Sequence, residues 1–155
     1  MKILFVGNSY TYYNDMPTLF SRLCGCNGKR AMVFSVTHGG RKLHENLDPN
    51  DPVTRQLDAV TAQNTMDVCI LQEHSILPIT DFERFSANVT GLMDKLGPAR
   101  FVLYQTWGRK TGSCLSAMTH FRTLFGQLPS DLSCFDLSDE TKAIFLDTVQ
   151  AVCDR

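Results

Sequence analysis

The sequence predicts a doubly wound α/β fold built around a parallel sheet. Short apolar segments alternate along the chain with longer segments whose apolar residues recur at helical spacing. The first four apolar segments are nearly continuous, which is typical of parallel strands that helices cover on both faces. Strands that alternate with helices are joined by right-handed crossovers. For a chain of this length we expect four or five strands in the order 2-1-3-4-5.

The expected strands are residues 2–6, 31–36, 67–71 and 100–105, with a weaker fifth strand at 134–137. Amphipathic helices are expected between them. The clearest begins after Asp81 as its N-cap, carries an apolar stripe from Phe82 to Leu96, and ends at Gly97. Further helices are expected from about Asn14, over residues 52–62, from Met118 to Leu128, and from Ser138 to the C-terminus.

Composition excludes several functional classes. Of the 155 residues, 43% are hydrophobic and 20% are charged, which fits a single globular domain rather than a disordered chain. The net charge is −1 and no dense Lys/Arg cluster occurs, so we expect no nucleic-acid partner. No segment is long and apolar enough for a signal sequence or a membrane span. The six cysteines form neither a disulfide framework nor a metal motif, so we expect a reduced, cytoplasmic protein without a metal.

Polar residues and glycines follow each of the first four expected strands. These segments are residues 7–11, 37–40, 72–75 and 106–108. Because ligands bind beyond the carboxyl ends of parallel strands, we expect the four segments to meet at one edge of the sheet. Residues far apart in the sequence would then share one site.

This edge contains the groups that acyl transfer from an ester requires, namely a hydroxyl nucleophile and donors for an oxyanion. Ser9 supplies the hydroxyl, and the backbone N–H groups of Ser9 and Gly40 are candidate oxyanion donors. A side chain of Gln72 or His74 is a candidate third donor. The structural alternative is that Ser9 caps a helix, Gly40 belongs to a turn, and Gln72 and His74 only tie down loops.

The four segments resemble the sequence blocks of the SGNH (GDSL-like) hydrolases, in particular a bacterial branch with a Gly-Asn-Ser nucleophile block. The similar blocks are residues 7–11, 36–40, 70–75 and 104–108. The resemblance implies a flavodoxin-like, three-layer α/β/α fold and a serine esterase or carbohydrate deacetylase that needs no cofactor. It implies Ser9 as the nucleophile, Gly40 as the second-block donor, and His74 or Gln72 at the third-block position.

The general base of that family comes from a C-terminal Asp-x-x-His, which this sequence does not contain. The expectation is therefore one SGNH-like domain, residues 1–155, that is truncated at its C-terminus. His38 and His74 lie at the predicted edge and are candidate substitute bases. We expect His44 to be solvated and His120 to be a surface or boundary residue of a helix.

The sequence thus predicts an SGNH-type serine esterase for small-molecule esters of short acyl groups, including acetyl groups on a sugar. One alternative is a catalytically impaired module that binds an acylated or sugar ligand without turnover. Another is a flavodoxin-like binder of phosphate or nucleotide, although the first loop lacks the glycine-rich run that such a site uses. An apolar face exposed by truncation would also make a homodimer an expectation.

Overall fold

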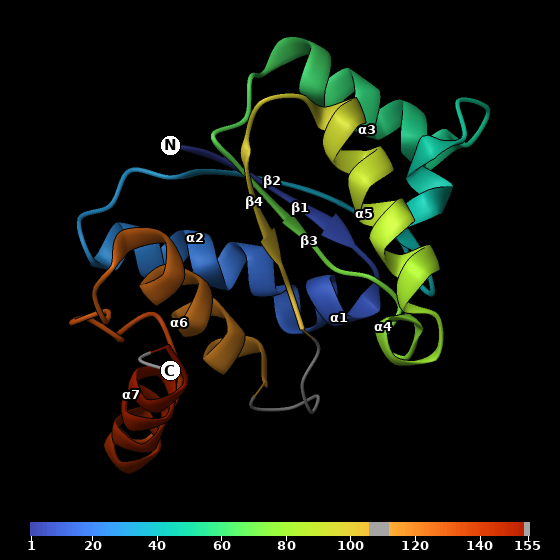
Figure 1. Ribbon diagram of the computed structural model, residues 1–155. Coiled ribbons are helices and arrows are strands. Elements are labelled where there is room, and N and C mark those ends of the chain that lie inside the picture. The colour runs from blue at the N-terminus through green and yellow to red at the C-terminus, as the bar shows by residue number, and fades with distance from the viewer. Residues whose placement is uncertain (106–111, 154–155) are drawn as a thin grey trace. The chain divides into compact units, whose positions relative to one another are not determined.

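A computed structural model describes residues 1–105 and 112–153 of the chain (Figure 1). The chain divides into two compact units. The first contains Met1–Tyr12 and the segment that begins at Met32 and runs through the last strand of the sheet. The second contains Tyr13–Ala31 and the C-terminal helices.

The first unit contains a parallel four-stranded sheet in the order β2-β1-β3-β4. The strands are β1 (Lys2–Gly7), β2 (Met32–Thr37), β3 (Val68–Leu71) and β4 (Arg100–Leu103). In the register, Val6 of β1 lies between Val36 of β2 and Leu71 of β3. The first four predicted strands, their parallel direction and their order are confirmed. Only the strand ends differ, since β4 stops two residues earlier than expected.

The helices of the first unit are α1 (Ser9–Tyr12), the 3-10 helix η2 (Leu43–Leu47), α3 (Pro52–Gln63), α4 (Leu77–Thr80) and α5 (Phe82–Leu96). The two long helices start where the sequence predicts them, because each has an acidic N-cap. Asp51 accepts hydrogen bonds from two backbone N–H groups of α3, and Asp81 accepts one from Arg84. Gly97 then ends α5 with a φ of 75°, a conformation that favours glycine.

One face of the sheet is covered by α3 and α5. The buried side chains on this face include Leu4 and Val6 of β1, which form one cluster with Leu57 of α3 and with Val89 and Leu92 of α5. These residues come from the apolar stripes that predicted the helices. The packing therefore fixes the carboxyl ends of the strands, where α1 and α4 lie (Figure 1).

The second unit is helical. It consists of the 3-10 helix η1 (Tyr13–Asp15), α2 (Met16–Cys26), α6 (Gly112–Phe125) and α7 (Asp139–Cys153), with α6 in contact with both other helices. α2 begins later than predicted because Asn14 and Asp15 both have a φ of 52°, which interrupts the helix. Ser138 lies at the start of α7 as predicted, and its hydroxyl accepts a hydrogen bond from the N–H of Thr141.

The predicted fifth strand at 134–137 does not form; these residues adopt turns and irregular structure. The Asp131 carboxylate accepts a 2.8 Å hydrogen bond from the Ser133 N–H, and the Leu132 carbonyl accepts one from the Phe135 N–H. These local bonds satisfy the backbone in a turn and compete with strand pairing. Within the described segments, no helix has the length and apolar character needed to cross a membrane.

Candidate active site at the carboxyl edge of the sheet

Ser9 is the first residue of α1 and follows the end of β1 by two residues. Gly7, the last residue of the strand, is closely enclosed by other residues. A Cβ atom on Gly7 would lie 2.4 Å from Thr11 Oγ1 and 2.8 Å from Gln72 Oε1, so only glycine fits. The Ser9 side chain is half-buried, and among the described residues its hydroxyl has no hydrogen-bond partner.

The side chain of Gln72 joins the end of β3 to the loop that carries Ser9. Its Oε1 atom accepts hydrogen bonds from the Asn8 N–H at 2.8 Å and from the Thr11 hydroxyl at 3.0 Å. Its Nε2 atom donates to the backbone carbonyl of Glu73. Gln72 is fully buried, and both ends of its amide are occupied by protein groups. In this arrangement the amide positions the Ser9 loop.

Gly40 lies in the loop after β2, next to the Ser9 loop. The His38 N–H donates to the Gly7 carbonyl at 3.2 Å, and the Asn8 side-chain amide donates to the Arg41 carbonyl at 2.9 Å. These two bonds bracket Gly40 in the sequence and tie its loop to residues 7 and 8. Gly40 is exposed and has a φ of 70°. Its N–H has no partner within the parts of the chain that the structure describes.

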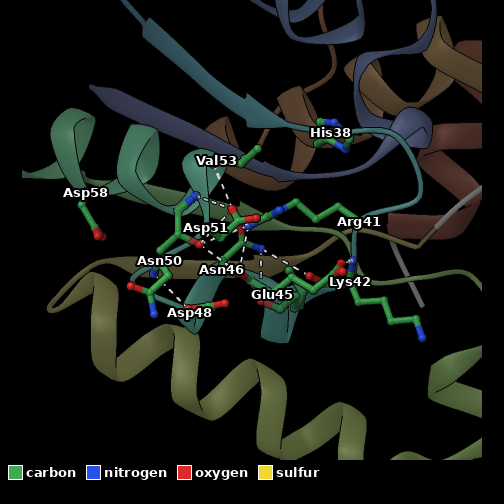
Figure 2. A network of polar contacts seen from close by, with 12 residues as sticks. His38, Arg41, Lys42, Glu45, Asn46, Asp48, Asn50, Asp51, Val53 and Asp58 are labelled. Atoms are coloured by element: carbon green, nitrogen blue, oxygen red, sulfur yellow. Dashed lines mark hydrogen bonds and ion pairs between the residues drawn. The ribbon is translucent and has the colours of Figure 1, made fainter.

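Arg41, the residue after Gly40, anchors this loop through a network of polar contacts (Figure 2). Its buried guanidinium donates to Asp51 Oδ1 at 2.6 Å, to Asn46 Oδ1 at 2.8 Å and to Thr54 Oγ1 at 3.1 Å. The Arg41 guanidinium, and after it the Thr54 N–H, hold the pKa of the Asp51 carboxyl well below its usual range. A buried charge with this many partners gives the loop one defined conformation.

Glu73 is a buried carboxylate beneath the third loop. It accepts hydrogen bonds from the His74 N–H at 2.6 Å, from Asn88 Nδ2 at 3.0 Å and from the Leu43 N–H at 3.2 Å. These donors compensate for the burial of its charge. The carboxylate thereby fixes the backbone of His74, whose half-buried side chain lies at the edge where a third oxyanion donor was expected.

The remaining histidines differ in their surroundings. His38 is exposed, with its Nδ1 atom 3.2 Å from the Gly39 carbonyl oxygen. The expectation that His44 is solvated is only partly correct, because its Nδ1 atom is buried without a hydrogen-bond partner. The expectation for His120 is wrong: it is buried in α6, where its ring meets that of Phe20 edge-on, and burial lowers its pKa to about 4.

Sequence reasoning missed the two residues that anchor the loops, Arg41 and Glu73. Each follows a predicted site residue directly, but several of its partners lie 10 or more residues away along the chain. One signal was present for Arg41, since Asp51 before Pro52 is typical of a helix N-cap and an N-cap carboxylate can also bind a cation. The predicted fourth segment, Thr106-Trp107-Gly108, lies outside the described residues.

The described residues contain no group of three or more His, Cys, Asp or Glu side chains placed to hold a metal ion. The residues that surround Ser9 act as hydrogen-bond donors and acceptors. They bring the loops after β1, β2 and β3 together through Asn8, Gln72 and Arg41, as the predicted convergence at one edge requires.

No family model and no curated protein sequence matches this chain. Two solved structures resemble it. One is described as "a putative SGNH hydrolase" from Slackia heliotrinireducens; it has 26% sequence identity and a TM-score of 0.60, and the match covers 97% of this chain and 72% of that one. The other is a DUF4886 family protein from Bacteroides uniformis ATCC 8492, with 16% identity, a TM-score of 0.55, and coverage of 81% and 64%. With its four-stranded parallel sheet, the chain therefore has the SGNH hydrolase-like α/β fold.

Proposed function

We propose that this chain is a serine hydrolase of the SGNH type that acts on esters of short acyl groups. The observation that carries the proposal is the hydrogen-bonded connection between the Ser9 loop and the Gly40 loop through Asn8 and Arg41. It supports a site in which the Ser9 hydroxyl and the backbone N–H groups of Ser9 and Gly40 face one substrate. The SGNH-like fold supports the same reaction class.

In the proposed reaction, Ser9 Oγ attacks the ester carbonyl carbon while its proton passes to a base. The N–H groups of Ser9 and Gly40 and the side chain of His74 stabilise the oxyanion of the tetrahedral intermediate. Collapse of the intermediate breaks the bond to the alcohol, which leaves with a proton, and an acyl-enzyme remains. Water then releases the acid. Acetyl esters on a sugar are one proposed kind of substrate in this class.

The candidates for the general base are His38 and His74. A serine hydroxyl without a base is a poor nucleophile at neutral pH. Among the described residues no histidine bonds to the Ser9 hydroxyl, which favours a second candidate function. In that alternative, the chain binds a small acylated ligand at this edge and does not turn it over.

Hydrolysis of p-nitrophenyl acetate and butyrate by the wild-type protein and by Ser9→Ala tests the proposal. We expect turnover with the wild type and a loss of at least about 100-fold with Ser9→Ala, in line with removal of a nucleophile. Equal rates for the two proteins would exclude catalysis by Ser9. Melting temperatures of both proteins show whether the variant is folded, since a half-buried serine has no hydrogen bond to lose here.

The variants His38→Gln and His74→Gln distinguish the candidate bases. Loss of the base removes the acid limb of the pH–rate profile, whereas loss of an oxyanion donor lowers kcat without changing the profile. His44→Gln is a control at a histidine outside the proposed site. If hydrolysis is absent, binding of acetate or butyrate to the wild type but not to a Gly40→Ala protein would support the non-catalytic alternative.

A further inference from the structure

A pocket of about 350 Å³ opens beside β3 and β4 in the first unit. Its walls are mainly apolar and come from both strands, from α4 and from α5. They include Leu71, Pro78, Ile79, Phe85 and Leu103. Concave sites of this size with apolar walls and a few polar groups are typical of small-molecule binding sites.

Two of these wall residues are far more exposed than large apolar side chains normally are. Ile79 is 86% exposed and Leu103 is 53% exposed. Ile76, which directly precedes α4, and Phe82, the first residue of α5, are also exposed. A concentration of exposed apolar side chains around a pocket indicates that the pocket binds an apolar group, which would cover these side chains.

The pocket adjoins the loop of the proposed nucleophile. Tyr104 lines the pocket, and its hydroxyl donates a 3.4 Å hydrogen bond to the carbonyl of Tyr10, the residue after Ser9. Leu71, another wall residue, is followed by Gln72, whose side chain binds the Asn8 N–H. His74 also lines the pocket. The pocket is thus lined by a proposed oxyanion donor, His74, and by Tyr104, whose hydroxyl binds the loop that carries Ser9.

We infer that this pocket receives the apolar acyl group of the ester. The protein therefore prefers esters with longer acyl groups, from butyryl up to octanoyl, over acetyl esters. The inference rests on the proposed function. At roughly 30 Å³ for each water-sized group, the pocket has room for about ten heavy atoms, which is well beyond an acetyl group. The walls combine polar side chains such as His74 with apolar side chains such as Ile79, which fits an ester carbonyl and its hydrocarbon chain.

The test compares kcat/KM for p-nitrophenyl acetate, butyrate and octanoate. Burial of each methylene group gives a factor of about four, so butyrate, with two more methylene groups, is expected to exceed acetate by about fifteenfold. Ile79→Asp places a charge on the pocket wall at a position exposed enough to tolerate it. We expect this variant to reduce the octanoate-to-acetate ratio at least tenfold. Ile144→Asp is the matched control: Ile144 is 57% exposed and lies on α7, and the ratio should stay at the wild-type value.

Several outcomes separate this inference from the proposed function. Ser9-dependent hydrolysis with an unchanged chain-length ratio in Ile79→Asp would overturn the inference and leave the proposed function intact. If no ester is hydrolysed, the proposed function fails, and calorimetric titration with sodium octanoate decides the inference by itself. Binding of octanoate by the wild type and Ile144→Asp, with at least tenfold weaker binding by Ile79→Asp, would support the pocket. Equal binding by all three proteins, or none, would refute it.

Discussion

The side-chain amide of Asn8 donates a 2.9 Å hydrogen bond to the backbone carbonyl of Arg41, and both residues are buried. Asn8 immediately precedes Ser9, and Arg41 immediately follows Gly40. A single bond over 33 positions of sequence therefore links the two loops whose N–H groups we expect to bind the oxyanion. The geometry of the proposed site therefore depends on this bond, together with the bond from the His38 N–H to the Gly7 carbonyl.

We predict that Asn8→Asp weakens both the fold and the site. The aspartate cannot donate to the Arg41 carbonyl, and it adds a charge in a buried position. We expect the free energy of unfolding in urea to fall by about 1–3 kcal/mol, the cost of an unsatisfied buried polar group. Ser9-dependent hydrolysis should fall as well. Gln63→Glu makes the same amide-to-carboxylate change at an exposed position of α3 and should change neither quantity. Equal unfolding curves for both variants would contradict the prediction.

The ion pair of Arg41 and Asp51 predicts a specific loss of stability in acid. The folded-state pKa of Asp51 is below its ordinary value of 3.8, so the unfolded chain takes up the proton first as the pH falls. The stabilisation by ionised Asp51 is complete above about pH 4 and is lost progressively below it. We expect Asp51→Asn to lower the urea midpoint at pH 7, with a difference from wild type that shrinks between pH 4 and pH 2.

Asp58 gives the control for that experiment. It forms a 2.8 Å ion pair with Lys95, but its side chain is 48% exposed, and exposed pairs contribute about 0–1 kcal/mol. Asp58→Asn should therefore change the urea midpoint at pH 7 less than Asp51→Asn does. A midpoint difference for Asp51→Asn that is the same at pH 7 and pH 2 would show that the carboxylate charge is not what stabilises the loop.

Periodicity and capping residues were sufficient to predict most of the fold. Continuous apolar segments identified β1 and β3, and the Asp81 N-cap with its following stripe identified α5, because these features act over a few residues of sequence. The prediction of a fifth strand was wrong because it also depended on the composition of a few neighbouring residues. Residues 134–137 have strand-like composition, but the preceding Asp131 binds the Ser133 N–H and favours a turn.

The site was predictable only in outline. Gly7, Ser9 and Gly40 could be located because strand ends and glycines mark the carboxyl edge of a parallel sheet. The partners of Arg41 and Glu73 could not, since a hydrogen bond between distant residues leaves no periodic pattern in one sequence. The pocket beside β4 was also missed, because its apolar walls come from four separate elements.

Gly40→Ala and Gly28→Ala form a matched pair that separates backbone strain from a role in the site. Both glycines have a positive φ, 70° and 67°, and an added Cβ would meet no atom within 4 Å at either position. We expect each variant to lose about 1 kcal/mol of stability from the left-handed conformation. Only Gly40→Ala should also lower kcat/KM, by roughly 10- to 100-fold, because its methyl group keeps the carbonyl oxygen from the N–H. If both variants lose the same stability and have equal kcat/KM, Gly40 does not contribute to the oxyanion site.

The burial of His120 predicts a second loss of stability in acid, at a higher pH than the loss caused by protonation of Asp51. Burial lowers the pKa of folded His120 from 6.5 to about 4. Between these values the unfolded chain binds a proton that the folded chain does not, so the free energy of unfolding decreases as the pH falls from 6.5 to about 4. The total decrease is up to roughly 3 kcal/mol at 1.36 kcal/mol per pKa unit. Urea unfolding at half-unit steps across this range would measure it.

His120→Phe tests whether this histidine is responsible. Phenylalanine keeps an aromatic ring against Phe20 but cannot be protonated, so the decrease between pH 6.5 and pH 4 should largely disappear. His38→Gln removes an exposed histidine and should leave the decrease as in the wild type. The comparison is made between slopes with pH, so a change in overall stability caused by the larger ring does not affect it. A slope that persists in His120→Phe would mean that groups other than His120 cause the decrease, and that burial of His120 in α6 does not.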